Sequence, residues 1–418
     1  MSTAGSRRAG VRGWITENVL LGVSLRAYLA SLLTPLDIAA AGLVVVGLVL
    51  VGMRFTLGLD AVTSASQEQP WGLLLGVGLF AAVPLSATGY VLGSAVYLFG
   101  VKDLRPVVKN AILIGFLGYF FAVVFLLIDL GRPWRIYYPM FVSYGTASVM
   151  FLVAWHVALY LSVQFLEFSP DLFQWLDLRR LQHMARRMTV GLTIFGVILS
   201  TLHQSALGGM YLLAPFKLHP LWYTSFLPWL FFVSSIAAGL SMVILVSALN
   251  AGFFRDRADP EYLASLDHIT MRLGRGAAYV LLTYFGFKLV TVAHENNWAY
   301  LNTAYGYWFL IESLGLVLFP CFFFAYATRR GSVPLVRLAA LITIVGIIAN
   351  RLTVSVFAYN WNLPDREWLN WKEFLIVIAV ITMEVVVYRW IVNRMPVLTV
   401  EEGGGETTME PHAQPVRS

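Results

Sequence analysis

Residues 107–130 read VVKNAILIGFLGYFFAVVFLLIDL, an apolar run long enough to cross a lipid bilayer as one helix. Such a helix needs about 20 mostly apolar residues, because the hydrocarbon core is roughly 30 Å thick. Nine further stretches of this kind lie before and after it. The ten predicted spans are Leu36–Leu57, Trp71–Phe99, Val107–Leu130, Phe141–Leu166, Met188–Leu213, Phe226–Asn250, Arg275–Ala293, Gly306–Ala327, Leu335–Ala358 and Trp371–Val392. Each is continuous, unlike the short alternating strands of an outer-membrane barrel, so the sequence predicts an all-α polytopic integral membrane protein.

The composition agrees with lipid as the main solvent of this chain. Hydrophobic residues make up 58% of the 418 residues, the mean hydropathy is +0.72, and only 12% of the residues are charged. Soluble globular proteins have roughly 25% charged residues, so this chain cannot cover its surface with polar groups in water. The single cysteine, Cys321, excludes an intramolecular disulfide, a CxxC motif and a cluster ligated by several cysteines of this chain.

The basic residues predict how the chain is oriented. The two chain ends and alternate connections carry twenty-one of the 29 Lys and Arg residues, whereas the other five connections carry five. Lys and Arg concentrate in cytoplasmic connections, so we expect both termini on the cytoplasmic side of a bacterial cytoplasmic membrane. The net charge of +6 then reflects orientation in lipid, and nucleic-acid binding is not expected. Arg54, Lys288 and Arg351 lie inside predicted spans.

The segments outside the spans are short. Residues 1–35 are expected to form a cytoplasmic N-terminal segment in which Trp14–Leu33 is an interfacial helix. Residues 36–393 form the membrane domain, and its longest connection, Glu167–Arg187, has about twenty residues. No soluble catalytic domain fits in these connections. The composition after Pro396 predicts that residues 394–418 are a disordered cytoplasmic tail.

Ionisable side chains inside a membrane are costly, and they are therefore candidates for function. The predicted spans contain Asp129, His156, His203 with Gln204, Lys288, Glu312, Arg351 and Glu384. Most of them lie toward the predicted outer face, which favours a polar pocket opening there. Structural alternatives stay open: Lys288, Glu312 and Arg351 can form a salt-bridge cluster, because buried charges must be paired. His203 can bond a backbone carbonyl, and Arg54 and Glu384 can pair near helix ends.

The histidines argue against a haem. A haem with two histidine ligands needs them on facing helices at matching depth, and only His156 and His203 lie well inside spans. At about 1.5 Å per residue, these two lie about 21 and about 15 Å from the outer ends of their spans. The mismatch of roughly 6 Å disfavours a shared haem, and we expect no haem, no iron–sulfur cluster and no other metal in this chain.

Two motifs resemble those of a known family. The first is Ile128-Asp129-Leu130-Gly131-Arg132-Pro133-Trp134-Arg135, where the third span ends on the predicted outer face. As helix-end punctuation, Gly131 ends the helix and Pro133 blocks its continuation. DLGRP followed by aromatic and basic residues also resembles the signature of the NrfD/PsrC family, the membrane subunits of polysulfide-reductase-type complexes. The second motif, STLHQSALG over residues 200–208 with HPLWY over residues 219–223, is similar to the ten-span, HybB-like branch of that family.

The resemblance implies a fold and a function. The implied fold is two four-helix bundles, here residues 71–213 and 226–358, flanked by the first and tenth spans. Family members exchange electrons between membrane quinone, menaquinone or ubiquinone, and an iron–sulfur partner. The implied partners are a ferredoxin-like iron–sulfur subunit on the periplasmic side and, through it, a hydrogenase, a molybdoenzyme or a multihaem cytochrome. A secondary transporter and a haem-b anchor of a dehydrogenase are the alternatives.

The candidate residues take roles in this chemistry. Quinol oxidation releases two protons with two electrons, so a quinone site needs acid/base groups, and histidine with a carboxylate suits it best. We therefore expect His203, Gln204 and Asp129 to line a quinone pocket. We expect the partner to dock on the exit motif, at Gly131, Arg132, Pro133 and Arg135. A proton path or a buried charge cluster is expected from His156, Lys288, Glu312, Arg351 and Glu384.

Overall fold

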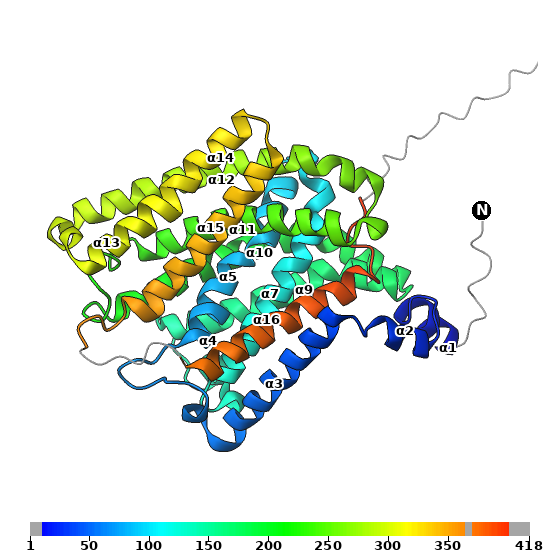
Figure 1. Ribbon diagram of the computed structural model, residues 1–418, viewed down its shortest axis with the longest axis horizontal. Coiled ribbons are helices and arrows are strands. Elements are labelled where there is room, and N and C mark those ends of the chain that lie inside the picture. The colour runs from blue at the N-terminus through cyan, green and yellow to red at the C-terminus, as the bar shows by residue number, and fades with distance from the viewer. Residues whose placement is uncertain (1–10, 364–369, 401–418) are drawn as a thin grey trace, which may run out of the picture.

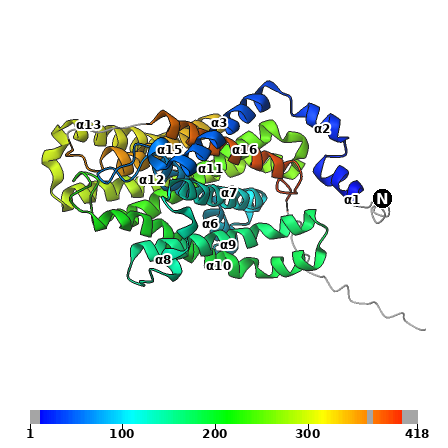
Figure 2. The same ribbon diagram turned by 90° about the horizontal axis from the view of Figure 1, so that it is seen from below.

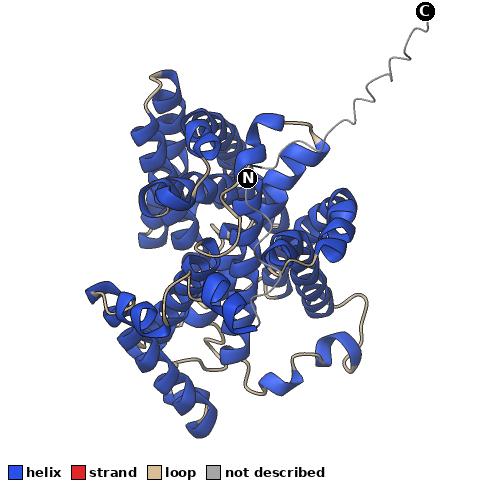
Figure 3. Ribbon diagram, turned by 90° about the vertical axis from the view of Figure 1, so that its right-hand side faces the viewer, coloured by secondary structure: helices blue, strands red, loops and turns tan. Residues whose placement is uncertain are grey.

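The computed structural model describes residues 11–363 and 370–400. Helices and connecting loops make up this part of the chain, and no strand occurs within it (Figure 3). One isolated bridge pairs Leu218 with Tyr359. Within these residues, ten helical segments are long and apolar enough to cross a membrane, as the sequence predicts. The chain is therefore an all-α, multi-pass membrane protein.

The spans differ in how regular they are, and several consist of consecutive segments. The first five are α3 (Pro35–Leu57); α4 (Leu73–Leu75), η4 (Gly76–Ala81), α5 (Ala82–Leu85), α6 (Thr88–Gly93) and η5 (Ser94–Leu98); η6 (Lys102–Leu104) with α7 (Arg105–Asp129); α9 (Val149–Trp175); and α10 (Arg179–Gly209) with η8 (Met210–Leu213). The last five are α11 (Leu227–Phe253); α12 (Pro260–His294); α13 (Ala304–Leu310), η11 (Ile311–Leu318) and α14 (Phe319–Arg329); α15 (Val333–Leu352) with η12 (Thr353–Phe357); and α16 (Trp371–Val392). Outside the spans lie α1 (Val11–Trp14), η2 (Ile15–Val19), α2 (Leu25–Ser31), η3 (Leu59–Ala61), η7 (Pro133–Arg135), α8 (Tyr138–Phe141), η9 (Arg255–Arg257) and η10 (Asn297–Asn302).

Three helices extend beyond the apolar runs that predict them. The sequence predicts a span over 141–166, but α9 covers 149–175; α10 begins nine residues before Met188, and α12 begins fifteen residues before Arg275. Only residues 176–178 join α9 to α10, so the predicted connection Glu167–Arg187 is wrong. A helix satisfies its own backbone hydrogen bonds in lipid and in water. Hydropathy therefore marks the membrane boundary and not the end of the helix.

Helix packing brings spans together that are far apart in sequence. The first and last spans, α3 and α16, lie side by side (Figure 1). In Figure 2, α9 and α10 lie on one side of the molecule and α3 on the other, with α7 between them. α11 contacts α5, α6 and α10 as well as α12 and α15. Gly239 permits this close approach, because a Cβ atom there would lie 3.0 Å from the Ala87 backbone.

Three spans contain π-helical segments, and the ninth span ends in one of them, η12. The second span contains η4 and η5, and the eighth contains η11, which precedes Pro320. Proline has no N–H group to donate within the helix. Irregular backbone at membrane depth is tolerated only where protein buries it, and π-helical segments are frequent at functional sites. η11 carries Glu312 and η12 follows Arg351, so both adjoin the buried charges described below.

The described ends of the chain meet at one end of the helix bundle. Arg394 donates to the Val19 carbonyl at 2.7 Å and to the Tyr28 hydroxyl at 2.8 Å. We call this the basic end; it comprises residues 11–34, 99–104, 176–178, 254–259, 330–332 and 393–400. The opposite end, with residues 130–148, is the motif end. The predicted single helix Trp14–Leu33 is wrong: Gly22, at φ 81°, lies in the turn between η2 and α2.

Residues 394–400 are packed against the basic end. Val397 and Leu398 are buried, and Asp259 binds this segment through its carboxylate, which accepts from the Val400 N–H at 3.0 Å. The prediction of a disordered tail from residue 394 is therefore wrong for these residues, because their apolar side chains find a buried surface. The remainder of the predicted tail, 401–418, and residues 1–10 lie outside the described residues.

Candidate functional site

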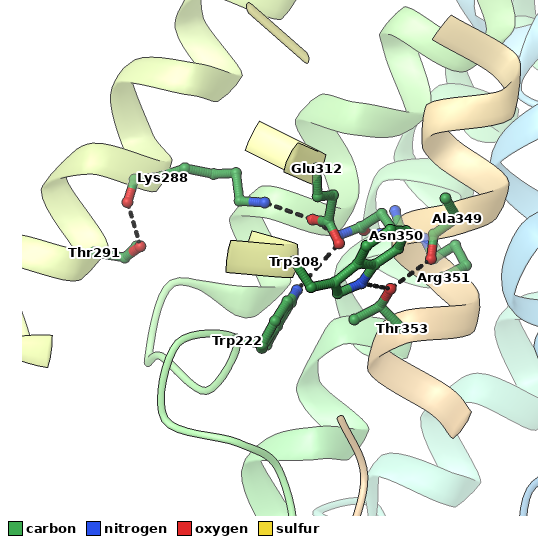
Figure 4. A network of polar contacts seen from close by, with 9 residues as sticks. All are labelled: Trp222, Lys288, Thr291, Trp308, Glu312, Ala349, Asn350, Arg351 and Thr353. Carbon is green, nitrogen blue, oxygen red and sulfur yellow. Dashed lines mark hydrogen bonds and ion pairs between the residues drawn. The ribbon is translucent and has the colours of Figure 1, made fainter. Parts of the chain in front are cut away.

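The carboxylate of Glu312 is the centre of a buried hydrogen-bond network (Figure 4). Its Oε1 accepts from Lys288 Nζ at 2.6 Å and from Asn350 Nδ2 at 2.7 Å. Its Oε2 accepts from Trp222 Nε1 at 3.2 Å. These donors come from α12, α15 and the loop before α11. A buried polar network is stable when its members are satisfied, and three donors converge on this one carboxylate.

Arg351 joins this network through Asn350. Its Nη1 donates to Asn350 Oδ1 at 2.7 Å, and its Nη2 donates to Ser234 Oγ on α11 at 2.7 Å. The guanidinium carbon lies 3.7 Å from the centre of the Phe231 ring, a cation–π contact. The structure thus brings Lys288, Glu312 and Arg351 into one network. Trp222, Ser234 and Asn350 are members that the sequence analysis did not single out.

The network has an excess of positive charge. It contains two cations, Lys288 and Arg351, and one carboxylate, all nearly inaccessible to solvent. A buried charge without a counter-charge is costly inside a membrane, so this arrangement favours negative charge or electron-rich oxygen nearby.

The adjoining cavity, lined among others by Trp222 and Tyr284, has a volume of about 20 Å³, which is room for about one water molecule. It is too small for a quinone ring.

His203 and Gln204 lie in a second polar cluster, between α5, α7, α9 and α10. Gln204 Nε2 donates to the Val83 carbonyl at 3.1 Å and to the Tyr119 hydroxyl at 3.3 Å. The His203 ring is 0% exposed and lies 5.7 Å from the Tyr119 ring, centre to centre. Neither of its nitrogens has a hydrogen-bond partner among the residues that the structure describes, and the same holds for Gln204 Oε1. The carbonyl-bonded alternative for His203 is therefore not what the structure shows.

His156 and Glu384 approach this second cluster. His156, half-buried on α9, is close enough to His203 to interact electrostatically. Glu384 Oε1 on α16 lies 3.7 Å from the position that a Cβ atom would take on Gly118 of α7. Neither residue contacts Glu312 in the described part of the chain. In residues 11–363 and 370–400, no group of three or more His, Cys, Asp or Glu side chains is placed to hold a metal ion.

Asp129 lies apart from His203. Tyr119, which contacts His203, precedes Asp129 by ten residues on α7, which is about 15 Å along the helix. Asp129 instead interacts electrostatically with Arg54 of α3 and Glu373 of α16. Arg54 donates to the Ile128 and Leu130 carbonyls at the end of α7, where a cation is favourable. Arg54 therefore joins α3 to the end of α7 at the motif end, and the Asp129 carboxylate lies near this contact.

The DLGRP motif begins an exposed surface at the motif end. α7 ends at Asp129, Gly131 follows, and Pro133 opens the short turn η7. Six residues, which we call the motif patch, are exposed or partly exposed here: Arg132, Trp134, Arg135, Tyr137, Phe141 and Tyr144. Trp134 is 67% exposed. Exposed tryptophan, tyrosine and arginine are typical of protein interfaces.

His219 is a buried residue to which the sequence analysis assigned no role. Its ring stacks on Tyr305 with 4.7 Å between ring centres, and its Nδ1 accepts from the Leu221 N–H at 3.2 Å. Burial lowers the pKa of His219 to about 4, so the imidazole is neutral at pH 7. The HPLWY loop is thereby held in a shape that directs Trp222 at Glu312.

Comparison with known proteins identifies the family. The sequence model described as "Polysulphide reductase, NrfD" matches residues 61–361. A protein of Nitratidesulfovibrio vulgaris is 45% identical over 370 residues, which cover 88% of this chain and 95% of that protein. The probable Ni/Fe-hydrogenase 2 b-type cytochrome subunit of Escherichia coli is 28% identical over 358 residues, 85% of this chain and 90% of its own. The menaquinone reductase integral membrane subunit of N. vulgaris is 26% identical over 336 residues, 72% and 77% of the two chains. Because the family match extends over more than half of its residues, this chain belongs to the NrfD family.

Proposed function

We propose that this chain is the quinone-reactive membrane subunit of a respiratory oxidoreductase. It exchanges electrons between menaquinone or ubiquinone and a ferredoxin-like iron–sulfur subunit on the periplasmic side, and through it a hydrogenase, a molybdoenzyme or a multihaem cytochrome. Two relatives support this proposal, since their names describe a hydrogenase subunit and a menaquinone reductase subunit. The observation that carries it is His203, a fully buried imidazole whose two nitrogens have no partner among the described residues.

The proposed chemistry places His203 beside one quinone oxygen. A histidine can donate a hydrogen bond to the quinone and accept a proton from the quinol. Gln204, held by Val83 and Tyr119 through its amide nitrogen, offers its Oε1 to a quinol hydroxyl. Asp129 lies about 15 Å farther along α7 than Tyr119, the residue that packs against His203. We therefore assign Asp129 to proton exchange at the motif end and not to contact with the same oxygen.

The motif patch is the proposed docking surface for the iron–sulfur partner. Arg132 and Arg135 complement an acidic ferredoxin-like surface, and the exposed aromatic rings supply apolar contact. Gly131 and Pro133 determine where the chain leaves α7. Without a redox group of its own, the chain would pass electrons directly from the quinone beside His203 to the partner docked at the motif end.

We infer that the two candidate histidines do not hold a haem. One relative is named a b-type cytochrome subunit, and His156 and His203 are the pair that a haem would use here. His203 is enclosed by protein, with Tyr119 against its ring and Tyr160 packed on Tyr119 at 4.6 Å. A macrocycle ligated by both histidines would displace several of these side chains, whereas one quinone oxygen needs only a small opening beside the His203 ring. We therefore propose that the chain uses exchangeable quinone alone.

Purification of the intact complex tests this function. We expect the preparation to contain extractable quinone and an iron–sulfur protein, and the separated membrane subunit to lack the absorption band of reduced haem b. Reduced-minus-oxidised spectra and quinone extraction from the same sample measure both. A stoichiometric haem band in the separated subunit would reject the haem-free proposal. Absence of both quinone and an iron–sulfur protein from an active, pure preparation would favour a transporter.

The proposed orientation has a separate test. Both termini should be cytoplasmic and the motif end periplasmic, because twenty-one basic residues lie on the terminal side and five on the other. A reporter fused after Ser418 should be active only in the cytoplasm, and one inserted within residues 130–141 only in the periplasm. The reverse pattern would move the docking surface to the cytoplasm and contradict the proposal.

A proton-conducting role is proposed for the Glu312 network. The network supplies titratable groups and a positive field through Lys288, Glu312 and Arg351. The other two candidates, His156 and Glu384, lie near the His203 cluster and outside this network. The excess positive charge supports a field-tuning role, since it stabilises negative charge that forms nearby.

A further inference from the structure

The first turns of α10 present an exposed cationic face. Arg179, Arg180, His183 and Arg187 line a shallow surface hollow together with Met184 and Met188. Of these arginines, Arg179 alone forms an ion pair with a described residue, the exposed Asp177 at 3.4 Å. Positive side chains are unfavourable at a helix N-terminus, where the helix dipole is also positive. The positive charge of these arginines would therefore be stabilised by an anion from outside the chain.

The backbone N–H groups of the first turn of α10 also favour an anionic ligand. The residue that precedes α10 is Leu178, whose side chain cannot cap the helix, and the structure shows no side-chain cap there. The first four N–H groups of a helix need acceptors, and phosphate groups are common acceptors at helix N-termini. Backbone donors and arginine side chains thus favour the same kind of ligand.

An apolar stripe continues this face toward the membrane interior. Met184, Met188, Phe195, Ile198 and Leu202 recur at intervals that keep them on one side of α10, the side that also carries Arg180 and Arg187. Met184, Phe195 and Ile198 are about half exposed. A cationic head above an exposed apolar stripe matches a phosphate group attached to an acyl chain. A soluble anion would gain nothing from the stripe.

Tryptophans place the cationic face at the membrane surface. Trp175, at the end of α9, contacts Trp14 at 5.1 Å and Trp390 at 5.8 Å between ring centres. Tryptophan concentrates at the boundary between lipid and water. Because Arg179 follows Trp175 by four residues, the cationic turns lie at the depth of the phospholipid head groups.

We propose that the start of α10 is a binding site for one anionic phospholipid. Its phosphate is held by Arg180, Arg187 and the first N–H groups of α10, with His183 beside them, and one acyl chain lies along Met184, Phe195 and Ile198. Basic pockets next to membrane helices bind anionic head groups in this way. The site is separate from the quinone and partner sites and does not depend on which leaflet surrounds it.

Native mass spectrometry of the full-length protein in detergent tests the site. We expect phosphatidylglycerol to bind at least tenfold more tightly than phosphatidylcholine. The variant Arg180→Gln/Arg187→Gln should lose this preference, whereas Arg180→Lys/Arg187→Lys, which keeps the charge, should retain most of it. The matched control is Arg255→Gln/Arg257→Gln, which removes the same charge from the same end of the molecule and should bind like the wild type. Thermal unfolding confirms that each variant is folded.

Three results would overturn the proposal. Equal binding of the two lipids by the wild type means that the head-group charge is not recognised. Equal loss in the control variant means a general charge effect and no defined site. Full displacement of phosphatidylglycerol by equimolar inorganic phosphate means a soluble-anion site. In contrast, if Met184→Gln/Ile198→Gln weakens lipid binding without changing phosphate binding, the acyl part of the proposal is supported.

Discussion

Replacing His203 by glutamine is expected to lower quinone-linked turnover by about 100-fold or more, the effect of losing a positioned acid/base group. The imidazole is fully buried and its nitrogens have no partner among the described residues, so the substitution breaks no hydrogen bond that holds the fold. Glutamine retains a hydrogen-bonding group of similar size but cannot exchange a proton near neutral pH. The measurement is electron transfer to a soluble quinone analogue by the complex purified with its partner subunits.

The control must separate chemistry from packing. Tyr119→Phe removes the hydroxyl that Gln204 contacts at 3.3 Å but leaves His203 unchanged, and we expect a loss of less than tenfold. Thermal unfolding and subunit content should match the wild type for both variants. Wild-type turnover in an assembled His203→Gln complex would remove this residue from the mechanism. A large fall in its unfolding temperature would assign it to packing.

Replacing Glu312 by glutamine is expected to destabilise the protein by about 3–5 kcal/mol, the cost of leaving a buried charge without its partner. Lys288 Nζ lies 2.6 Å from Glu312 Oε1, and the network already contains a second cation, Arg351. The double variant Glu312→Gln/Lys288→Met removes both charges and should recover most of that stability. Thermal or denaturant unfolding of the purified protein in one detergent measures the stability of both variants relative to the wild type.

The same double variant tests the proton-conducting proposal. Because it is expected to fold, its proton movement and its quinone turnover can be compared in proteoliposomes. We expect proton movement per electron to fall more than quinone turnover. Glu384→Gln, which removes a carboxylate that lies near Gly118 and outside the Glu312 network, is the matched carboxylate control for the stability comparison. If the double variant moves protons like the wild type, or if both activities fall equally with stability, the network is a structural salt bridge.

The sequence alone determined the class of fold. Length and hydropathy identify ten spans because the thickness of the bilayer sets the length of an apolar helix, whatever its neighbours are. The exit motif from Ile128 to Arg135 and the segment around His203 resembled the NrfD family, and the family comparison confirms that resemblance. Both features are local in sequence. Hydropathy did not predict the helix ends. For example, α10 begins at Arg179, nine residues before the predicted span, because a helix can extend beyond the apolar segment.

Tertiary structure decided which polar groups meet. Sequence position placed Asp129 and His203 in the same half of the membrane. In the structure, His203 packs against Tyr119, which lies about 15 Å along α7 from Asp129. Glu312 instead gathers Trp222, Lys288 and Asn350 from three other segments. Met395, Val397 and Leu398 are buried, and Asp259, which is distant in sequence, accepts a hydrogen bond from Val400 beside them. These outcomes depend on the rotation, depth and packing of helices against one another, and apolar periodicity in a span that is hydrophobic on all sides carries little information about rotation.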